Sequence, residues 1–270
     1  MKDLRTYGAY AVVTGASSGI GEQFARQLAA AGVNVVLVAR RKDRLEALAA
    51  ELSRAHGVES KAVALDLLAD GAVQDLARQT SDLDIGIVVA NAGIFHAGPF
   101  VANELSDELD VLALDGALPL QLAHRFGREF VRRGRGALIL VSSSLATSPV
   151  PYQANYAAVK AYVLSLGQAL NHEWKEHGVD VLVVSPGPTQ TEGLDNAIGI
   201  DFRKLGGRKM DPARVASTAL ANLGRRAHVI PGLSNNLADL AGKYLLPRSA
   251  SVRLYGRIIK QALTGSETAA

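Results

Sequence analysis

Short apolar runs alternate with longer stretches of helical periodicity along most of the chain. The predicted strands cover residues 9–14, 34–39, 59–65, 85–90, 136–142, 180–184 and 228–230. Several are apolar at nearly every position, as in strands buried on both faces of a parallel sheet. The predicted helices between them cover residues 20–31, 41–55, 70–79, 104–132, 153–177 and 211–224. This alternation predicts an α/β fold, a single doubly wound Rossmann-type domain with a parallel seven-stranded sheet and C-terminal helices.

The pattern contains no internal repeat, low-complexity segment or linker. A chain of 270 residues suits one large domain, so we expect residues 1–270 to form a single catalytic domain. A substrate lid is expected at about 188–210 and a helical extension at about 233–264. The extension is predicted to form two helices separated at Pro247. Its apolar and basic positions fit a lid or subunit contact, with a membrane-surface helix as the alternative.

Composition narrows the function classes. The chain has no cysteine, which excludes disulfides and thiolate chemistry and is compatible with a cytoplasmic location. Its net charge is only +3 and its basic residues are scattered, so no nucleic-acid partner is expected. Arg132, Arg133 and Arg135 are predicted to form a solvated turn. No signal-like segment or apolar run of about 18 residues predicts membrane association. No histidine–carboxylate set has metal-ligand spacing, so no metal is expected.

A glycine-rich segment follows the first predicted strand and opens the first predicted helix. Its glycines, Gly15, Gly19 and Gly21, follow the pattern G-x-x-x-G-x-G. Glycines allow a tight turn and a close backbone approach, and the helix N-terminus favours a pyrophosphate. A glycine-rich turn without a ligand is the alternative. The position between a strand and a helix favours dinucleotide binding.

Basic residues follow the second predicted strand, where an acidic residue would hydrogen-bond the ribose hydroxyls of NAD. Arg40, Arg41 and Lys42 stand there instead. The planar arginine fork suits a ribose 2′-phosphate, so we expect NADP(H) to be preferred over NAD(H). The alternative is a solvated basic start of a helix. Ser18 is a second candidate phosphate contact, although helix capping is an equal possibility for its side chain.

Tyr156 and Lys160 lie four residues apart in a predicted helix and therefore share one face. A nearby ammonium stabilises a phenolate and lowers the tyrosine pKa, so the pair can act as a general acid or base. Ser143, at the end of the fifth predicted strand, can hold the substrate oxygen where negative charge develops. Together with the glycine loop, these residues predict hydride transfer onto or from a carbonyl carbon.

These ordered motifs resemble the short-chain dehydrogenase/reductase family, in its branch about 250 residues long, over roughly residues 10–232. The resemblance implies that Asp66 contacts the adenine, that Asn91 steadies the central strand, and that Thr191 holds the carboxamide. Lys160 would also bind the nicotinamide ribose. The expected cofactor-binding set is Gly15, Ser17, Ser18, Gly19, Ile20, Gly21, Arg40, Arg41, Asp66, Leu67, Asn91, Ala92, Gly93, Tyr156, Lys160, Pro186, Gly187, Thr189 and Thr191.

The chain differs from the family's pattern at Asp115, which aligns with an asparagine found where the long helix is kinked. In the family, a backbone carbonyl at this kink is thought to hold a water that links the lysine to solvent. An acidic side chain here can form an ion pair with Lys160, which would stabilise the ammonium and alter the pH optimum. The candidate catalytic set is therefore Ser143, Tyr156, Lys160 and Asp115.

The expected substrate pocket is mostly apolar, which favours a ketone or an acyl chain over a highly charged metabolite. The substrate contacts predicted for it are Phe95, Leu145, Tyr152 and Pro188. His96 is expected at the pocket rim without a catalytic role. The alternative function is a cofactor-binding regulatory or scaffold protein, and a nucleotide-sugar epimerase is a third, less favoured reading. The family also implies a homodimer or homotetramer that pairs through the helices at 104–132 and 153–177.

Overall fold

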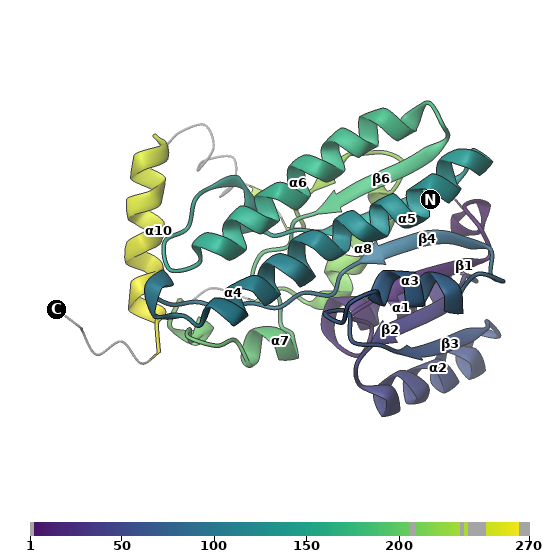
Figure 1. Cartoon of the computed structure of the whole chain (residues 1–270), viewed down its shortest axis with the longest axis horizontal. Coiled ribbons are helices and arrows are strands. Elements are labelled where there is room, and N and C mark those ends of the chain that lie inside the picture. The colour runs from purple at the N-terminus through teal and green to yellow at the C-terminus, as the bar shows by residue number, and fades with distance from the viewer. Residues whose placement is uncertain (1–2, 206–208, 233–234, 237–246, 265–270) are drawn as a thin grey trace.

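The computed structural model describes residues 3–205, 209–232, 235–236 and 247–264 (Figure 1). Its strands are β1 (Tyr10–Thr14), β2 (Asn34–Ala39), β3 (Ser60–Ala64), β4 (Ile85–Ala90), β5 (Gly136–Val141), β6 (Val179–Val184) and β7 (His228–Val229). They form one seven-stranded sheet in the order β3-β2-β1-β4-β5-β6-β7. All neighbouring strands are parallel. The predicted fold class is thus confirmed.

Helices cover both faces of the sheet. The main ones are α1 (Gly19–Ala30), α2 (Lys42–His56), α3 (Ala72–Gln79), α4 (Leu105–Leu112), α5 (Leu118–Arg133), α6 (Ala154–Lys175), α8 (Pro212–Asn222) and α10 (Arg248–Ala262). Side chains of β1 alternate between two cores, with Val13 packed in the core of α1, α2 and α8 and Val12 in the core of α3, α5 and α6. Figure 1 views the sheet from the side covered by α3, α5 and α6.

The strand order places the crevice of the sheet between β1 and β4. From β1 the chain runs outward through β2 and β3, and it then returns to the other side of β1 as β4. Ligands of open α/β sheets bind beyond the carboxyl ends of the strands at such a reversal. The segments that follow β1, β4 and β5 therefore meet at the expected site.

The long helix predicted at 104–132 is interrupted by a π-helical segment, η3 (Ala113–Ala117), between α4 and α5. Pro119 explains the interruption, because it has no N–H to donate to the carbonyl of Asp115 four residues earlier and its ring crowds that carbonyl. The Leu118 N–H donates instead to the carbonyl of Ala113, five residues back. The kink that the family resemblance implied is therefore present.

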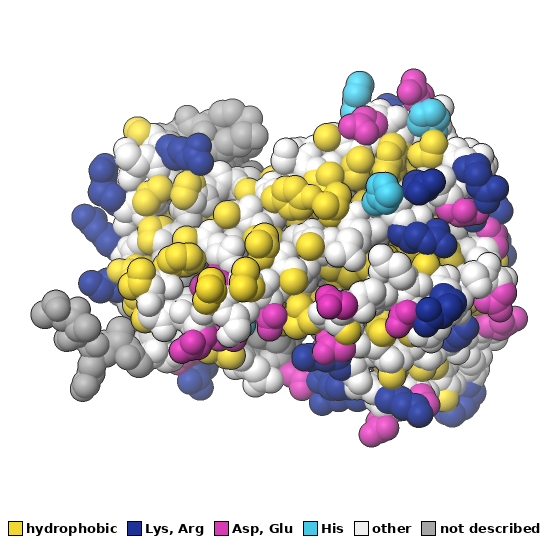
Figure 2. All heavy atoms as spheres, in the orientation of Figure 1, with side chains coloured by type: hydrophobic (Ala, Val, Ile, Leu, Met, Phe, Trp, Pro, Cys, Tyr) yellow, Lys and Arg dark blue, Asp and Glu magenta, His cyan; other side chains and the backbone are white. Residues whose placement is uncertain are grey.

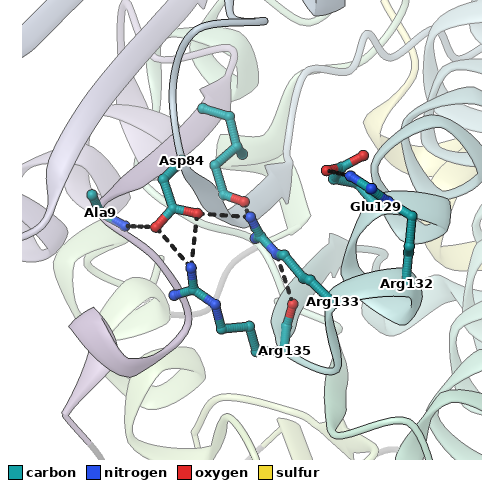
Figure 3. Close-up of polar contacts among 7 residues, drawn as sticks. Ala9, Asp84, Glu129, Arg132, Arg133 and Arg135 are labelled. Atoms are coloured by element: carbon teal, nitrogen blue, oxygen red, sulfur yellow. Dashed lines mark hydrogen bonds and ion pairs between the residues drawn. The ribbon is translucent and has the colours of Figure 1, made fainter.

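The arginines before β5 lie at an exposed turn, as the sequence predicts, but two of them also form ion pairs with one aspartate. Arg133 donates to the carboxylate of Asp84 at 2.8 Å, and Arg135 donates to the same carboxylate at 3.1 Å (Figure 3). Asp84 also accepts a hydrogen bond from the backbone N–H of Ala9. Among the three arginines, Arg132 is strongly exposed, as predicted. The cluster ties together the segments before β1, β4 and β5.

The C-terminal extension is described in part. Its second predicted helix is α10, whereas most of the first lies outside the described residues. The lid segment contains the short helices α7 (Glu192–Asp195) and η5 (Phe202–Leu205), and residues 206–208 also lie outside the described part. Within the described ranges, no helix combines the length and apolar character needed to cross a membrane.

Candidate active site

The glycine-rich loop after β1 turns tightly into α1. Gly15 and Gly19 have φ angles of +68° and +60°, which side chains rarely tolerate. A Cβ atom on Gly21 would lie 2.3 Å from the carbonyl oxygen of Gly15, so a larger residue there would displace the loop. The loop therefore brings its backbone and the N-terminus of α1 close to the cleft, as a pyrophosphate site requires.

Polar contacts join the ends of β1 and β4 beside this loop. The side-chain amide of Asn91 donates to the carbonyl of Thr14 at 2.9 Å. The Thr14 hydroxyl in turn accepts from the backbone N–H groups of Asn91 and Ala92 at 2.9 and 3.0 Å. Thr14 is fully buried, so these bonds satisfy a polar group that would otherwise destabilise the core. They also fix the two strand ends relative to each other.

Arg41 forms a polar pocket with the two serines of the glycine loop. Its guanidinium donates to Ser17 Oγ at 2.9 and 3.1 Å and to Ser18 Oγ at 2.8 Å. Ser18 occupies the N-cap position of α1, but its side chain makes no capping hydrogen bond. The Ser18 side chain therefore does not cap α1 and instead lies beside Arg41 at the basic end of the cleft.

The other basic residues after β2 differ in position. Arg40 lines the cleft, whereas Lys42 lies 3.7 Å from Glu46 in an exposed ion pair. Arg44 is a residue that the sequence reasoning missed, and with Arg41 it binds the carboxylate of Glu192 on α7. Arg44 follows Arg41, the N-cap residue of α2, by three residues, so the two lie on the same side of the helix. This spacing could have identified Arg44 from the sequence.

Ser143, Tyr156 and Lys160 line one cleft at the end of β5. The Ser143 hydroxyl accepts a hydrogen bond from the Leu145 N–H at 3.2 Å. The Lys160 ammonium lies 5.6 Å from the centre of the Tyr156 ring. It donates to the carbonyl of Val141 at 3.1 Å, which fixes its position beneath the cleft. The helix spacing of Tyr156 and Lys160, together with the place of Ser143 after β5, brings the three predicted side chains to one cleft.

Burial raises the pKa of the Tyr156 hydroxyl above its ordinary value. The Lys160 ammonium lowers this pKa, as the sequence predicts, and a hydrogen bond with Ser143 also lowers it, whereas Asp115 raises it. The effect of burial on the Tyr156 pKa therefore outweighs the opposite effect of the lysine charge. For Lys160 burial lowers the pKa, but attraction to Asp115 and Tyr156 prevails and raises it.

Asp115 is fully buried in the π-helical segment and faces Lys160. Its Oδ1 lies 3.3 Å from the Lys160 ammonium, and its Oδ2 accepts from the Ile94 N–H at 3.3 Å. A Cβ on Gly93 would lie 2.1 Å from Oδ1, so only glycine fits beside this carboxylate. Burial raises the Asp115 pKa, while the lysine charge opposes that shift. The predicted ion pair is present.

A cleft of about 820 Å³ runs from the arginine pocket, past the glycine loop, to Tyr156. All the expected cofactor-binding residues line it except Gly21, which packs against the loop instead. The cleft thus offers basic and hydroxyl groups at one end, glycine backbone in the middle and the acid–base pair beyond. These features fit a nicotinamide dinucleotide. Among the described residues, no group of three His, Asp or Glu side chains is arranged to hold a metal.

The far end of the cleft is apolar. Phe95, Leu145 and Pro188 line it as predicted, and the ring of Phe95 contacts that of Tyr156 edge-on, with centroids 4.8 Å apart. Tyr152 lies beside this region, where it lines a separate small pocket and packs in the same apolar cluster. His96 also lines the cleft, and its ring nitrogen is 3.9 Å from Asp107.

Several residues of this end were not predicted from the sequence. The helix α10 supplies Tyr255, Ile258 and Ile259 to the cleft wall. The side-chain amide of Gln153 is buried beside Tyr156 and has no hydrogen-bond partner among the residues that the structure describes. The apolar periodicity of α10 was visible, but its place against the cleft depends on long-range packing. No sequence signal distinguished Gln153 from an ordinary helix-start residue.

Comparisons with known proteins agree with this geometry. The family model for short chain dehydrogenases matches residues 9–198. A 7β-hydroxysteroid dehydrogenase of Collinsella aerofaciens is 32% identical over 85% of this chain and 88% of its own. A very-long-chain 3-oxoacyl-CoA reductase of Meyerozyma guilliermondii is 32% identical over 81% of this chain and 66% of its own. The human inactive hydroxysteroid dehydrogenase-like protein 1 is 30% identical over 68% of this chain and 56% of its own. The chain thus spans less than two thirds of several curated relatives.

Solved structures show the same fold over most of the chain. A 7β-hydroxysteroid dehydrogenase has a TM-score of 0.85 and 29% identity, covering 93% of this chain and 98% of its own. A short-chain dehydrogenase of Sphingobium yanoikuyae in complex with NADPH has a TM-score of 0.76 and 31% identity, covering 87% and 93%. A 3-ketoacyl-(acyl-carrier-protein) reductase of Brucella melitensis with NADH has a TM-score of 0.72 and 26% identity, covering 84% and 98%. The chain belongs to the short-chain dehydrogenase/reductase family.

Proposed function

We propose that this protein is an NADP(H)-dependent oxidoreductase that interconverts a carbonyl and an alcohol, with Tyr156 as general acid and base. The observation that carries the proposal is the grouping of Ser143, Tyr156 and Lys160 along one cleft that continues to the glycine loop. The relatives named as hydroxysteroid dehydrogenase and 3-oxoacyl-CoA reductase support the reaction class.

In the proposed mechanism, bound NADP(H) supplies or accepts the hydride at the substrate carbon. The Ser143 hydroxyl donates a hydrogen bond to the substrate oxygen and holds it near Tyr156. The Tyr156 hydroxyl gives its proton to this oxygen during reduction and takes it back during oxidation. The Lys160 ammonium stabilises the phenolate that forms, and the Asp115 carboxylate keeps Lys160 charged and in place.

The cofactor preference rests on the pocket of Arg41, Ser17 and Ser18. An arginine fork beside two hydroxyl groups offers several N–H and O–H donors to a phosphate. No acidic side chain follows β2 to bind the ribose hydroxyls of NAD. The relative in complex with NADPH is consistent with this preference, whereas the relative with NADH shows that the fold accommodates either cofactor.

The apolar end of the cleft favours a hydrophobic ketone or an acyl-chain substrate. Phe95, Phe202 and Ile259 belong to one apolar cluster between the lid and α10. Removing a hydrophobic substrate from water against such a surface is favourable, whereas a charged metabolite would lose hydration without a partner. We also propose that the protein acts in the cytoplasm.

The second candidate is a catalytically weak cofactor-binding protein with a regulatory or scaffold role. A relative named as inactive shows that this outcome exists among similar chains. The presence of Ser143, Tyr156 and Lys160 with their side chains in one cleft favours the enzyme. We also propose a homodimer or homotetramer, because α4 exposes Leu105, Leu109 and Leu112.

The experiment is a panel of apolar ketones, 3-oxoacyl thioesters and the corresponding alcohols, each assayed with NADPH or NADP and with NADH or NAD. The proposal predicts turnover of at least one apolar carbonyl, with higher kcat/KM for NADPH than for NADH. Tight binding of NADPH without turnover of any substrate would favour the scaffold role instead.

A further inference from the structure

An acidic side chain of the lid occupies the basic end of the cleft. Glu192 begins α7 and accepts from Arg41 Nη1 at 2.7 Å, from Arg44 Nη1 at 2.7 Å and from Arg44 Nη2 at 3.2 Å. The two arginines come from the start of α2, some 150 residues away in sequence. This contact spans the cleft between the second strand and the lid.

The guanidinium of Arg41 binds both the serines of the glycine loop and the Glu192 carboxylate. Arg41 uses Nε and Nη2 for Ser17 and Ser18 and uses Nη1 for Glu192. A guanidinium has five N–H donors in a rigid fork, so the donors given to a carboxylate are withdrawn from any other anion. The carboxylate also brings negative charge to the pocket. A phosphate entering there meets arginines that are already partly neutralised.

The charge of Glu192 persists at every ordinary assay pH. The two arginines lower the pKa of its carboxyl to about 2, with the hydrogen bond from Arg44 as the largest cause. The side chain is about 37% exposed and its partners 40% and 52%, so the ion pairs are partly screened by water. The contact is therefore weak enough for a phosphate to displace it.

We propose that Glu192 is a cofactor-selectivity residue that competes with the ribose 2′-phosphate for Arg41 and Arg44. Phosphate binding separates the carboxylate from the arginines, which links recognition of the cofactor to release of the lid at α7. A cofactor without the 2′-phosphate leaves the ion pairs intact. Glu192 thus weakens binding of phosphorylated cofactor and leaves that of the unphosphorylated form nearly unchanged. This inference rests on the proposed preference for NADP(H).

The position of Glu192 couples the competition to the rest of the lid. Thr191 directly precedes it, and the Thr191 hydroxyl accepts from the Leu194 N–H at 3.2 Å, capping α7. A Cβ on Gly19 would lie 2.9 Å from Cγ2 of Thr191, which shows that the lid packs against the glycine loop. Movement of Glu192 would therefore also move Thr191, whose side chain is expected to hold the carboxamide of the nicotinamide.

The test is equilibrium binding of NADPH and NADH to the wild type and to Glu192→Gln, measured by fluorescence titration without substrate. Glutamine keeps the shape and removes the charge. The matched control is Glu46→Gln, which removes the same charge from the exposed pair with Lys42 outside the cleft. Thermal unfolding of each variant checks that the fold is unchanged.

We expect Glu192→Gln to bind NADPH about 3- to 10-fold more tightly, a range typical of removing a partly screened competing charge. NADH binding should change less than about 2-fold, and the gain for NADPH should shrink in high salt. Glu46→Gln should leave both affinities unchanged. Unchanged or weaker NADPH binding by Glu192→Gln, or an equal gain for both cofactors, would overturn the inference.

The wild-type measurement separates this inference from the proposed function. A wild type that binds NADPH no better than NADH contradicts the proposed cofactor preference, whatever the variant does. A wild type that prefers NADPH, together with a variant of identical affinities, contradicts only the role of Glu192.

Discussion

The buried pair of Asp115 and Lys160 sets the electrostatics around Tyr156. Moving two charges from water into the protein interior costs more free energy than their mutual attraction returns, unless further hydrogen bonds satisfy their remaining polar atoms. The backbone N–H of Ile94 and the carbonyl of Val141 provide such bonds. Asp115 holds Lys160 charged, but it also raises the pKa of Tyr156. We propose that Asp115 is a positioning residue whose charge tunes this acid–base pair.

Replacing Asp115 with asparagine should keep the enzyme active and move its pH profile to lower pH. Loss of the negative charge removes one cause that raises the Tyr156 pKa, so we expect a shift of about 1 pH unit. In oxidation the phenolate is the base, and the rising limb of kcat/KM moves down. In reduction the phenol is the acid, and the falling limb moves down too.

The measurement is kcat/KM against pH in both directions. The control is Asp110→Asn, which removes the same charge from α4, one and a half turns earlier and outside the cleft. A profile of Asp115→Asn that superimposes on that of the wild type would sink the assigned role of Asp115.

At the residue level, sequence reasoning recovered the groups whose spacing follows from regular structure. Tyr156 and Lys160 lie one helical turn apart, and Ser143 follows a strand that the apolar pattern defines. Arg44 was within reach of the same argument. Glu192 and Gln153 were not, because their place depends on how the lid and the start of α6 pack against distant segments.

The π-helical segment is the element that delivers Asp115 to Lys160. In an unbroken α-helix the Pro119 position would donate to the Asp115 carbonyl, and proline removes that donor. The extra residue in the turn rotates the following helix and leaves Asp115 buried against Lys160. We therefore infer that Pro119, which touches no ligand, helps to position the charge beside the acid–base pair.

Replacing Pro119 with alanine should allow the α-helical bond to form and should displace the Asp115 carboxylate. A displacement of about 1 Å near a reacting centre can lower kcat by about 10- to 100-fold, and we expect such a loss with unchanged NADPH binding. The pH profile should move in the direction given for Asp115→Asn.

Steady-state kinetics and thermal unfolding provide the measurement. Pro212→Ala is the control, because proline at the first turn of α8 has no helical donor to restore. If Pro119→Ala retained the wild-type kcat and pH profile, the kink would not depend on this residue.

Element boundaries followed the apolar pattern closely for a physical reason. Strands β2 and β4 are buried on both faces, and they coincide with the predicted runs 34–39 and 85–90. Periodicity could not reveal the break at Ala113–Ala117, which the family resemblance implied, because the apolar stripe continues across it. It also missed the ion pairs of Asp84, which form between turns remote in sequence.

On the scale of the whole molecule, the face over α4, α5 and α6 is notably apolar. Figure 2 shows hydrophobic side chains gathered across this side of the molecule. The exposed ones include Leu105 at 70%, Leu109 at 53% and Leu112 at 50% of their full accessibility. A contiguous apolar surface of this kind is characteristic of a protein interface, and a second copy of the chain is the proposed occupant.

Replacing Leu109 with lysine should convert the proposed homodimer or homotetramer into a smaller species, because a buried unpaired charge in an apolar interface costs several kcal/mol. Sedimentation velocity measures the change. The control is Ala50→Lys, which introduces the same charge at an exposed position of α2, away from this face. A monomeric wild type, or an unchanged assembly in Leu109→Lys, would contradict the proposed interface.

The most direct test of the central claim is the turnover of Tyr156→Phe with the best substrate of the carbonyl panel and NADPH. Phenylalanine preserves the ring against Phe95 and removes only the hydroxyl, and Tyr162→Phe on the exposed side of α6 is its control. We predict a kcat about 10³-fold lower, with NADPH affinity unchanged within about 2-fold and a wild-type rate for Tyr162→Phe. Wild-type turnover by Tyr156→Phe would contradict this prediction.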